Sequence, residues 1–254
     1  MITKNDSKEY LEKKAKFASM LTFYGRNVVI EILQDSTVDI YKVHLSSSNK
    51  EESQILKIRE LAKKRNIEIK THSKEALSRV SKNSKQDQGV AIDVYASNYK
   101  NSSQIFDDLG DNFRLLALDG INNPQNLGMI IRSAAAGNID AIILSESKSA
   151  KLSPLVMKSS AGTVFKIPIY HTKNLAATLR EFKNSEIYVL SSHANSSLKD
   201  LHVKSRSIFV LGNESDGVSK DVFNCSTSPI KIDMNRGVES LNVAITSAII
   251  SFLP

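Results

Sequence analysis

The residues that could do chemistry fall in three polar segments, of which the first spans residues 118–138. It leads from a strand-like stretch through a polar turn into a helix-like stretch, and Asn126 stands six residues before Arg132. If Leu127–Ala136 is helical, Asn126 is placed as its N-cap and Arg132 projects from its second turn. Because an arginine stays protonated in proteins, Arg132 can stabilise a negative charge rather than act as a free base.

The second and third segments each lead from a strand into a polar loop. Residues 208–219 open into a glycine-bearing loop with Glu214 near its mouth. Residues 230–252 pass through a polar loop into Leu241–Phe252, a stretch that is apolar almost all round. A helix of that kind must be buried, either in a core or in a subunit interface.

Several other kinds of site are disfavoured. The chain has no G-x-G-x-x-G motif, and its one Walker-like spacing, Gly212–Gly217, is followed by Val218 and Ser219. A nucleotide triphosphatase or a dinucleotide enzyme is therefore not expected. The five histidines show no metal-ligand spacing, and we expect no metal. Cys225 is the only cysteine and lies outside any nucleophile motif, so neither a disulfide nor a catalytic thiol is expected.

The elements that must position these segments alternate between strand-like and helix-like stretches. This alternation predicts a parallel sheet covered by helices. The predicted strands are Leu115–Leu118, Ala141–Leu144, Val164–Ile169, Ile187–Leu190, Ile208–Leu211 and Ile230–Ile232. The predicted helices are Leu127–Ala136, Pro154–Ser160, Leu175–Phe182 and Leu241–Phe252.

A smaller α/β domain precedes this sheet. Its predicted elements are strand or helix-edge segments at Arg26–Leu33, Lys42–Leu45 and Ile67–Ile69, a helix at Glu51–Arg65 and a strand at Val90–Val94. The polar stretch Tyr95–Gln104 is typical of a linker. We therefore predict an N-terminal extension (1–19), a first domain (20–96), a linker (97–110) and a C-terminal domain (111–254).

The excess positive charge lies in the first domain. The net charge is +7, yet residues 42–85 hold 12 basic and 5 acidic residues, whereas residues 86–254 hold 16 of each. A solvated helical face is one explanation. Confinement of the excess to one window favours the other, a surface that neutralises the phosphates of a polyanion.

The composition is that of a globular protein. A hydrophobic content of 41% and a charged content of 24% exclude a disordered, collagen-like or coiled-coil chain. The N-terminus lacks the apolar run of a signal peptide, and no stretch approaches the roughly 18 apolar residues that span a membrane. We expect a cytoplasmic protein that does not associate with membranes.

Together the three segments resemble the signature motifs of the SpoU (TrmH-type) branch of the SPOUT RNA 2′-O-ribose methyltransferases. The motifs are Asn-Leu-Gly followed by Arg132, Leu-Gly-Asn-Glu followed by Gly217, and Ser-Leu-Asn-Val at 240–243. They stand in the family's order and at about its spacing, and Ser159–Gly162 matches an intervening helix end. The resemblance covers roughly residues 20–254.

The resemblance implies both a fold and a cofactor. It implies a C-terminal parallel-sheet SPOUT domain with a deep trefoil knot, plus a smaller N-terminal α/β RNA-binding domain. It also implies S-adenosylmethionine, held by backbone groups and apolar side chains at loop tips. The matching positions are Leu211, Gly212, Ile232, Met234 and Leu241. Family members are homodimers that pack a C-terminal helix beside the active sites, which would use the apolar Leu241–Phe252.

The resemblance further implies how methyl transfer is carried out. The donor sulfonium is already activated, so the enzyme must align the ribose 2′-OH and ease its deprotonation. Arg132 would stabilise the developing alkoxide. Asn126 and Glu214 would orient Arg132, while Ser240 and Asn242 would form or cap the cofactor loop.

The first domain extends the resemblance, with two departures in the chain as a whole. Residues 24–33 and Gln88 with its following glycine resemble the substrate-binding domain of members that modify large-subunit ribosomal RNA. Asp87 stands where relatives commonly have histidine, and a negative charge there could alter how this domain meets RNA. Asn138, preceded by Gly137, stands where the family usually has glycine, and we expect a shifted left-handed helix cap.

The implied function is S-adenosylmethionine-dependent 2′-O-methylation of RNA, with a guanosine in large-subunit ribosomal RNA as the first expectation. A transfer RNA methyltransferase and a non-catalytic RNA-binding protein of the same fold are the alternatives. Relatives that modify transfer RNA commonly lack the first domain. The motif residues that argue against a non-catalytic protein are Asn126, Arg132, Glu214, Ser240 and Asn242.

Overall fold

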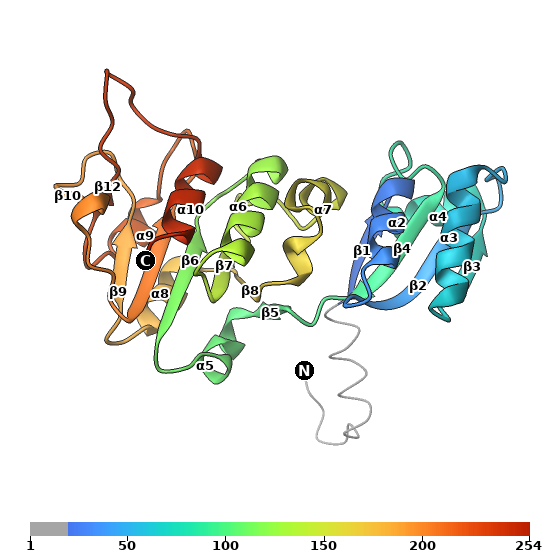
Figure 1. The fold of residues 1–254 in the computed structure, drawn as a ribbon, viewed down its shortest axis with the longest axis horizontal. Helices are drawn as coiled ribbons and strands as arrows, with labels where there is room; N and C mark the ends of the chain where they lie inside the picture. Colours follow the sequence, from blue (N-terminus) through green and yellow to red (C-terminus); the bar gives the residue numbers. More distant parts are fainter. Residues whose placement is uncertain (1–19) are drawn as a thin grey trace. The chain divides into compact units, whose positions relative to one another are not determined.

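Two compact units follow one another along the chain, and they divide after Ser97 (Figure 1). The structure is a computed structural model that describes residues 20–254. The N-terminal extension predicted at residues 1–19 lies outside the described residues. Within the described part of the chain, no helix is long and apolar enough to cross a membrane.

The first unit is a four-stranded sheet in the order β1-β4-β2-β3, with β4 antiparallel to both of its neighbours and β2 parallel to β3. This confirms the small α/β domain. Its elements are β1 (Met20–Tyr24), α2 (Arg26–Gln34), β2 (Asp39–Ser46), α3 (Ser53–Lys64), β3 (Ile69–His72), α4 (Lys74–Ser81) and β4 (Val90–Tyr95).

Helix α2 settles the segment whose pattern allowed either a strand or a helix edge. It buries Val29, Ile30, Ile32 and Leu33, a spacing that places apolar side chains on one helical face. Its C-terminal end is held by Arg65, whose guanidinium donates to the carbonyl oxygens of Ile32, Leu33, Asp35 and Val38. Arg65, although it belongs to the basic window of residues 42–85, therefore stabilises the fold of the first unit.

A hydrogen-bonded chain of polar side chains crosses this sheet from β1 to β3. The Thr22 hydroxyl donates to one Asp93 carboxylate oxygen at 2.6 Å, and the other lies 2.9 Å from His44 Nε2. His44 Nδ1 lies 2.9 Å from His72 Nε2. Burial alone would raise the pKa of Asp93, but the hydrogen bonds from His44 and Thr22 outweigh it and hold that pKa below its usual value. The two buried members, Asp93 and His44, therefore have hydrogen-bond partners within the sheet.

Asp87 differs from its expected role as a charge facing RNA. Its side chain is buried, and its two oxygens accept hydrogen bonds from the Ser81 hydroxyl at 2.8 Å and from the Gly89 N–H at 3.0 Å. Because both bonds lie within the connection from α4 to β4, the carboxylate shapes that loop.

The second unit is a six-stranded, entirely parallel sheet in the order β5-β8-β7-β6-β11-β9, as the alternation of elements predicts. The strands are β5 (Tyr99–Asn101), β6 (Phe113–Leu118), β7 (Ala141–Ser145), β8 (Ile169–Thr172), β9 (Glu186–Val189) and β11 (Arg206–Leu211). The helices are α5 (Ile105–Asp108), α6 (Pro124–Ala136), α7 (Pro154–Ser160), α8 (Leu175–Glu181), α9 (Lys220–Phe223) and α10 (Val243–Ser251). Short 3-10 turns stand at η1 (Ser102–Gln104), η2 (Thr163–Phe165) and η3 (Leu198–Asp200).

Helices cover both faces of this sheet, so its strands are buried on both sides. Leu115 and Ala117 of β6 belong to a core cluster that includes Leu175 and Leu179 of α8 and Val222 of α9. Successive strand residues point to opposite faces. The intervening residues of β6 therefore face the side on which α6 and α10 pack against each other (Figure 1).

The structure corrects the predicted linker at residues 97–110. Strand β5 pairs with β8 at the edge of the sheet, and the following turn and α5 bury Ile105 in the core. The side chain of Asn98 donates to the carbonyl oxygens of Val164 and Ile167. Polar composition concealed these tertiary contacts, and the segment is part of the second unit.

Two predicted strands also differ. The segment predicted as a strand at Val164–Ile169 begins as η2, and the carbonyls of Val164 and Ile167 accept from the Asn98 side chain, so β8 starts only at Ile169. The strand predicted at Ile230–Ile232 is β12 (Ile230–Lys231), which pairs with β10 (Ser196–Ser197) in a separate two-stranded sheet.

Asn138 does not form the left-handed cap that was expected, because the residues in positive φ do not include it. Its N–H donates to the Ser251 carbonyl at 2.6 Å, and its side chain donates to the Leu253 carbonyl at 3.0 Å. A Cβ at Gly137 would lie 2.2 Å from that Ser251 oxygen. The pair therefore allows the ends of α6 and α10 to approach closely.

Candidate active site

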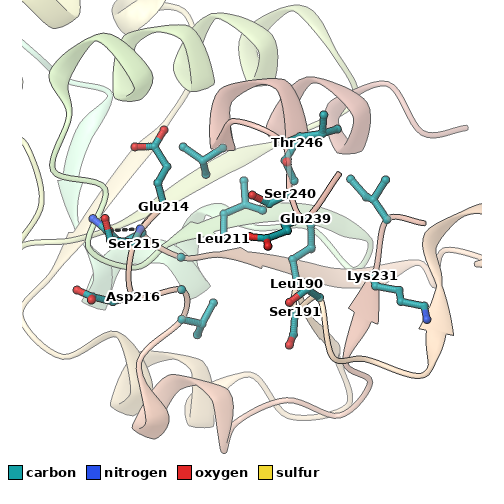
Figure 2. Close-up of a pocket in the computed structure, with 18 of the residues that line it drawn as sticks. Leu190, Ser191, Leu211, Glu214, Ser215, Asp216, Lys231, Glu239, Ser240 and Thr246 are labelled. Atoms are coloured by element: carbon teal, nitrogen blue, oxygen red, sulfur yellow. Dashed lines mark hydrogen bonds between the residues drawn. The ribbon is translucent and has the colours of Figure 1, made fainter. Parts of the chain in front are cut away.

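A pocket of about 790 Å³ lies at the carboxyl ends of β9 and β11 (Figure 2). Its walls come from residues 190–193 after β9, residues 211–218 after β11, and the loop from β12 into α10. Small-molecule ligands of open parallel sheets bind outside the carboxyl ends of the strands. The pocket therefore lies where this fold offers a ligand site.

The five residues predicted to hold the cofactor all line this pocket. They come from two separate parts of the chain and are Leu211, Gly212, Ile232, Met234 and Leu241. Three of the five predicted catalytic residues, Glu214, Ser240 and Asn242, line it as well.

Gly212 is required by a close approach of backbone. The loop after β11 folds back on itself, and Asn213 and Gly217 exchange N–H to carbonyl hydrogen bonds of 3.0 and 2.9 Å. A Cβ at Gly212 would lie 2.2 Å from the carbonyl carbon of Gly217 and 2.3 Å from the nitrogen of Val218. Only glycine allows this turn to close beside the pocket.

Asn126, Glu214 and Asn242 form one hydrogen-bonded cluster, although they come from three segments far apart in the sequence. The side-chain amides of Asn126 and Asn242 both donate to Oε1 of Glu214, the second at 2.9 Å. The Asn242 amide also lies 3.3 Å from Oδ1 of Asn126. The cluster thus joins α6 and the start of α10 to the loop after β11.

The position of Asn126 within α6 differs from the expected N-cap. The helix begins at Pro124, and the N-cap is Asn123, whose side chain accepts from the N–H of Gln125 at 2.9 Å. Proline at the first helical position fixes this earlier start. Asn126 therefore lies inside the first turn, 4% exposed, which frees its side chain for Glu214. Asn242, in contrast, is the N-cap of α10 and accepts from the N–H of Ala244 at 2.8 Å.

Arg132 is exposed on α6 and does not line the pocket. A helix turns about 100° per residue, so two residues six positions apart point about 120° away from each other. The structure records no hydrogen bond or ion pair of Arg132 with any described residue, and the expected orientation of Arg132 by Asn126 and Glu214 is not formed. The cluster and the arginine occupy different sides of the same helix.

Helix α6 is held against α7 by a second close approach. A Cβ at Gly128 would lie 2.1 Å from the Ser159 hydroxyl oxygen and 2.7 Å from the Val156 carbonyl oxygen. The Ser159 hydroxyl lies 3.4 Å from the Pro124 carbonyl. The glycine of the first motif and the serine of the intervening helix end therefore fix the helix that carries Asn126 and Arg132.

Two residues tie the strand ends together in a way that the sequence motifs do not predict. Asp119 accepts from the Ser219 N–H at 2.8 Å, and the Asn213 side chain donates to the Gly120 carbonyl at 2.9 Å. Both residues stand at or just after the ends of predicted strands. The carboxyl ends of adjacent parallel strands meet at one edge of a sheet, so polar residues at these positions are expected to lie close to the site.

The charged side chains of the pocket are mostly acidic. Glu214 and Asp216 lie on the β11 side, whereas Glu239, Ser240 and Thr246 come from the α10 side (Figure 2). Apart from the three carboxylates of Glu214, Asp216 and Glu239, the charged or titratable lining residues are His193 and Lys231. A ligand that carries positive charge suits such a lining. Among the described residues, no group of three or more His, Cys, Asp or Glu side chains could hold a metal ion.

Comparison with family models matches both units. The model described as the SpoU rRNA Methylase family matches residues 114–252. The model described as RNA 2′-O ribose methyltransferase substrate binding matches residues 23–100.

Curated relatives match across most of the chain. The 23S rRNA (guanosine-2′-O-)-methyltransferase RlmB of Xylella fastidiosa (strain 9a5c) is 30% identical over 233 residues, which cover 90% of this chain and 93% of that protein. The protein of the same name from Neisseria meningitidis serogroup B is 29% identical, with 92% and 94% covered. Among solved structures, the SpoU methyltransferase AviRb of Streptomyces viridochromogenes in complex with AdoMet has a TM-score of 0.70 at 18% identity, covering 94% of this chain and 90% of that chain.

Proposed function

Because the chain belongs to the SpoU rRNA methylase family, we propose that it methylates the ribose 2′-OH of a guanosine in large-subunit ribosomal RNA. It is an RNA 2′-O-methyltransferase that uses S-adenosylmethionine. The guanosine target is supported by the RlmB relatives, which align with this chain across both units. The observation that carries the proposal is that two distant family motifs line one pocket at the sheet edge, and that Asn126 of the first motif is hydrogen-bonded to Glu214 and Asn242 of the other two.

The pocket fits S-adenosylmethionine. Leu211, Ile232 and Leu241 offer apolar surface for the adenine ring, and the turn at Gly212 brings backbone groups to the pocket wall. The acidic lining complements the sulfonium and the ammonium group of this molecule. When bound, the cofactor supplies an activated methyl group.

We propose distinct roles for the predicted catalytic residues. Arg132 would stabilise the negative charge that develops on the 2′-oxygen. The cluster of Asn126, Glu214 and Asn242 would hold the pocket loop and the start of α10 in place, and Ser240 would complete the wall between them. The deep trefoil knot implied by the resemblance stays a prediction for this chain.

We propose that the protein acts as a homodimer in the cytoplasm, where its ribosomal substrate is found, and needs no metal. The support for a dimer is exposed apolar surface on α10 and at the residue that follows it, since Ile245 and Phe252 are 53% and 60% exposed. Met129, on the adjoining α6, is 41% exposed. Met129 and Arg132 lie three residues apart and share one side of α6. A partner packed over Met129 would therefore lie beside Arg132.

Ile245→Asp is expected to separate the proposed dimer. More than half of the Ile245 side chain is exposed, so a carboxylate is tolerated in the monomer but would be buried without a partner in the dimer, at about 3–5 kcal/mol. Sedimentation at micromolar concentration should show a dimer for the unaltered protein and a monomer for the variant. Leu56→Asp, on α3 of the first unit and 49% exposed, is the matched control and should remain dimeric. A monomeric unaltered protein would refute the dimer.

The function itself is tested by incubating the protein with labelled S-adenosylmethionine and either unmodified large-subunit ribosomal RNA or transfer RNA. We expect label at one alkali-resistant linkage of the ribosomal RNA, since a 2′-O-methyl group blocks cleavage at that site. Label on transfer RNA alone would show that transfer RNA, and not ribosomal RNA, is the substrate. Binding of cofactor and RNA without transfer to either RNA would favour the non-catalytic alternative.

A further inference from the structure

A second pocket, of about 530 Å³, lies within the first unit. Three connections meet there: the turn from β1 into α2, the loop from β2 to α3, and the loop from α4 to β4. Lys74, at the start of α4, also lines the pocket. No apolar side chain lines it. Lys74 and Lys85 contribute positive charge, whereas the Arg26 guanidinium is already paired with the Glu52 carboxylate. The remaining lining consists of serines, amides, Asp87 and Gly89. A lining of this kind suits a polar anionic ligand.

The loops around this pocket are fixed to one another before any ligand binds. Arg26 donates through its backbone N–H to the Gln88 side-chain oxygen at 3.1 Å and through Nε to the Gln88 carbonyl at 3.3 Å. Asn49 donates to the Gly89 carbonyl at 2.7 Å, and a Cβ on Gly89 would lie 2.1 Å from the Asn49 side-chain oxygen. Binding would therefore cost little ordering of these loops.

The charge that faces the pocket is positive. Asp87 is its one acidic lining residue, and that carboxylate is buried with both oxygens already hydrogen-bonded. Lys74 and Lys85 are exposed, and the structure records no hydrogen bond or ion pair of either ammonium group with a described residue. Two ammonium groups are thus available for a phosphate.

Amide groups on the wall remain available for a base. Gln54 uses its side-chain nitrogen to bind Asn27 at 2.6 Å, which leaves its oxygen as an acceptor. Gln88 uses its oxygen for the N–H of Arg26, which leaves its NH₂ group as a donor. A free acceptor and a free donor among the lining side chains suit the hydrogen-bonding edge of a nucleobase.

We propose that this pocket binds one unpaired nucleotide of the RNA substrate, with its phosphate on Lys74 and Lys85 and its base edge on Gln54 and Gln88. The proposal rests on the proposed function, because it assumes that RNA is the substrate. A base paired within an A-form helix is stacked and turns its edges into a narrow groove, so it cannot enter a loop-lined hollow. An unpaired nucleotide can enter, and the pocket would thereby select looped or bulged RNA.

The test compares two RNA probes on the full chain by fluorescence anisotropy. The probes are a random-sequence single-stranded 20-residue pool and a fully paired duplex of the same length. For Lys74→Ala/Lys85→Ala we expect affinity for the single-stranded pool to fall roughly 10-fold or more, as expected for losing charge-assisted contacts at two sites. Affinity for the duplex should change by less than about 3-fold, because it does not enter the pocket.

Lys57→Ala/Lys64→Ala is the matched control, since it removes the same charge from exposed positions of α3 that do not line the pocket. This variant should lower the affinity for both probes slightly and to the same extent. Equal losses for the two double variants would refute the pocket, as would unchanged single-strand affinity in the Lys74/Lys85 variant. Polyglutamate that binds the unaltered chain and displaces the single-stranded pool would instead indicate an acidic protein partner.

The outcome separates this inference from the proposed function. If the unaltered protein methylates no RNA but the Lys74/Lys85 variant loses affinity for single strands, the proposed activity is refuted and the proposed nucleotide pocket is supported. If methyl transfer to ribosomal RNA occurs and the variant binds single strands normally, the pocket alone fails. Unchanged S-adenosylmethionine affinity in the variant verifies that the second unit is intact.

Discussion

Arg132→Ala is expected to lower the rate of methyl transfer by roughly two orders of magnitude or more, the loss typical of removing one preorganised electrostatic group. The reason is that the 2′-oxygen gains negative charge as it loses its proton, and Arg132 is the cation that we propose stabilises this charge. Affinity for S-adenosylmethionine should not change, because Arg132 does not line the cofactor pocket. Single-turnover rates at saturating cofactor and RNA, with calorimetric cofactor binding, measure the two effects separately.

Two further variants make the Arg132 result specific. Arg132→Lys keeps the charge but loses the planar fork, so it should recover part of the activity. Arg180→Ala removes an exposed arginine from α8 in the same unit and should leave the rate unchanged. Near-normal transfer by Arg132→Ala would refute its catalytic role, and a matching loss of cofactor affinity would reassign it to binding. The melting temperature should not move, since Arg132 is exposed and bonded to no described residue.

The fold could be predicted from the sequence where local pattern and tertiary structure agree. Alternating apolar runs and helix-like stretches predict the parallel sheet, because strands covered on both faces must be apolar throughout. Leu115–Leu118 and Ile208–Leu211 are such runs, and they pair side by side in β6 and β11. The motif residues that follow them then meet at one edge, as the rule for parallel strands requires.

The remaining features depend on contacts that local pattern does not contain. The local sequence predicts Asn126 as a helix N-cap. Pro124 instead starts the helix earlier, which places the Asn126 amide within reach of Glu214. Asn138 reads as a left-handed cap, whereas it bonds to the end of α10. Asp87 is predicted to present a charge to RNA, whereas its carboxylate is hydrogen-bonded to Ser81 and Gly89. In each case the partner decides the role of the side chain.

Gly212→Ala is expected to lower the affinity for S-adenosylmethionine roughly 100-fold or more. The added Cβ would lie 2.2 Å from the Gly217 carbonyl carbon, and the three atoms nearest to it belong to the backbone and cannot rotate away. The turn must open, which breaks both hydrogen bonds between Asn213 and Gly217, at about 0.5–1.5 kcal/mol each, and displaces the pocket wall. Methyl transfer at low cofactor concentration should fall by the same factor, and calorimetry measures the affinity directly.

Gly217→Ala tests whether the steric contact, rather than the loss of any loop glycine, causes this effect. Gly217 has a φ of +68°, but a Cβ there would meet nothing within 4 Å, so the cost is the backbone strain of about 1–2 kcal/mol. Its loss of cofactor affinity should therefore be about tenfold, well below that of Gly212→Ala, and Gly217→Asn should recover part of it because asparagine tolerates this conformation. RNA affinity should stay unchanged in all three variants, since the basic window belongs to the other unit. Equal losses at the two glycines would show that general loosening of the loop, and not closure of the turn at Gly212, controls cofactor binding.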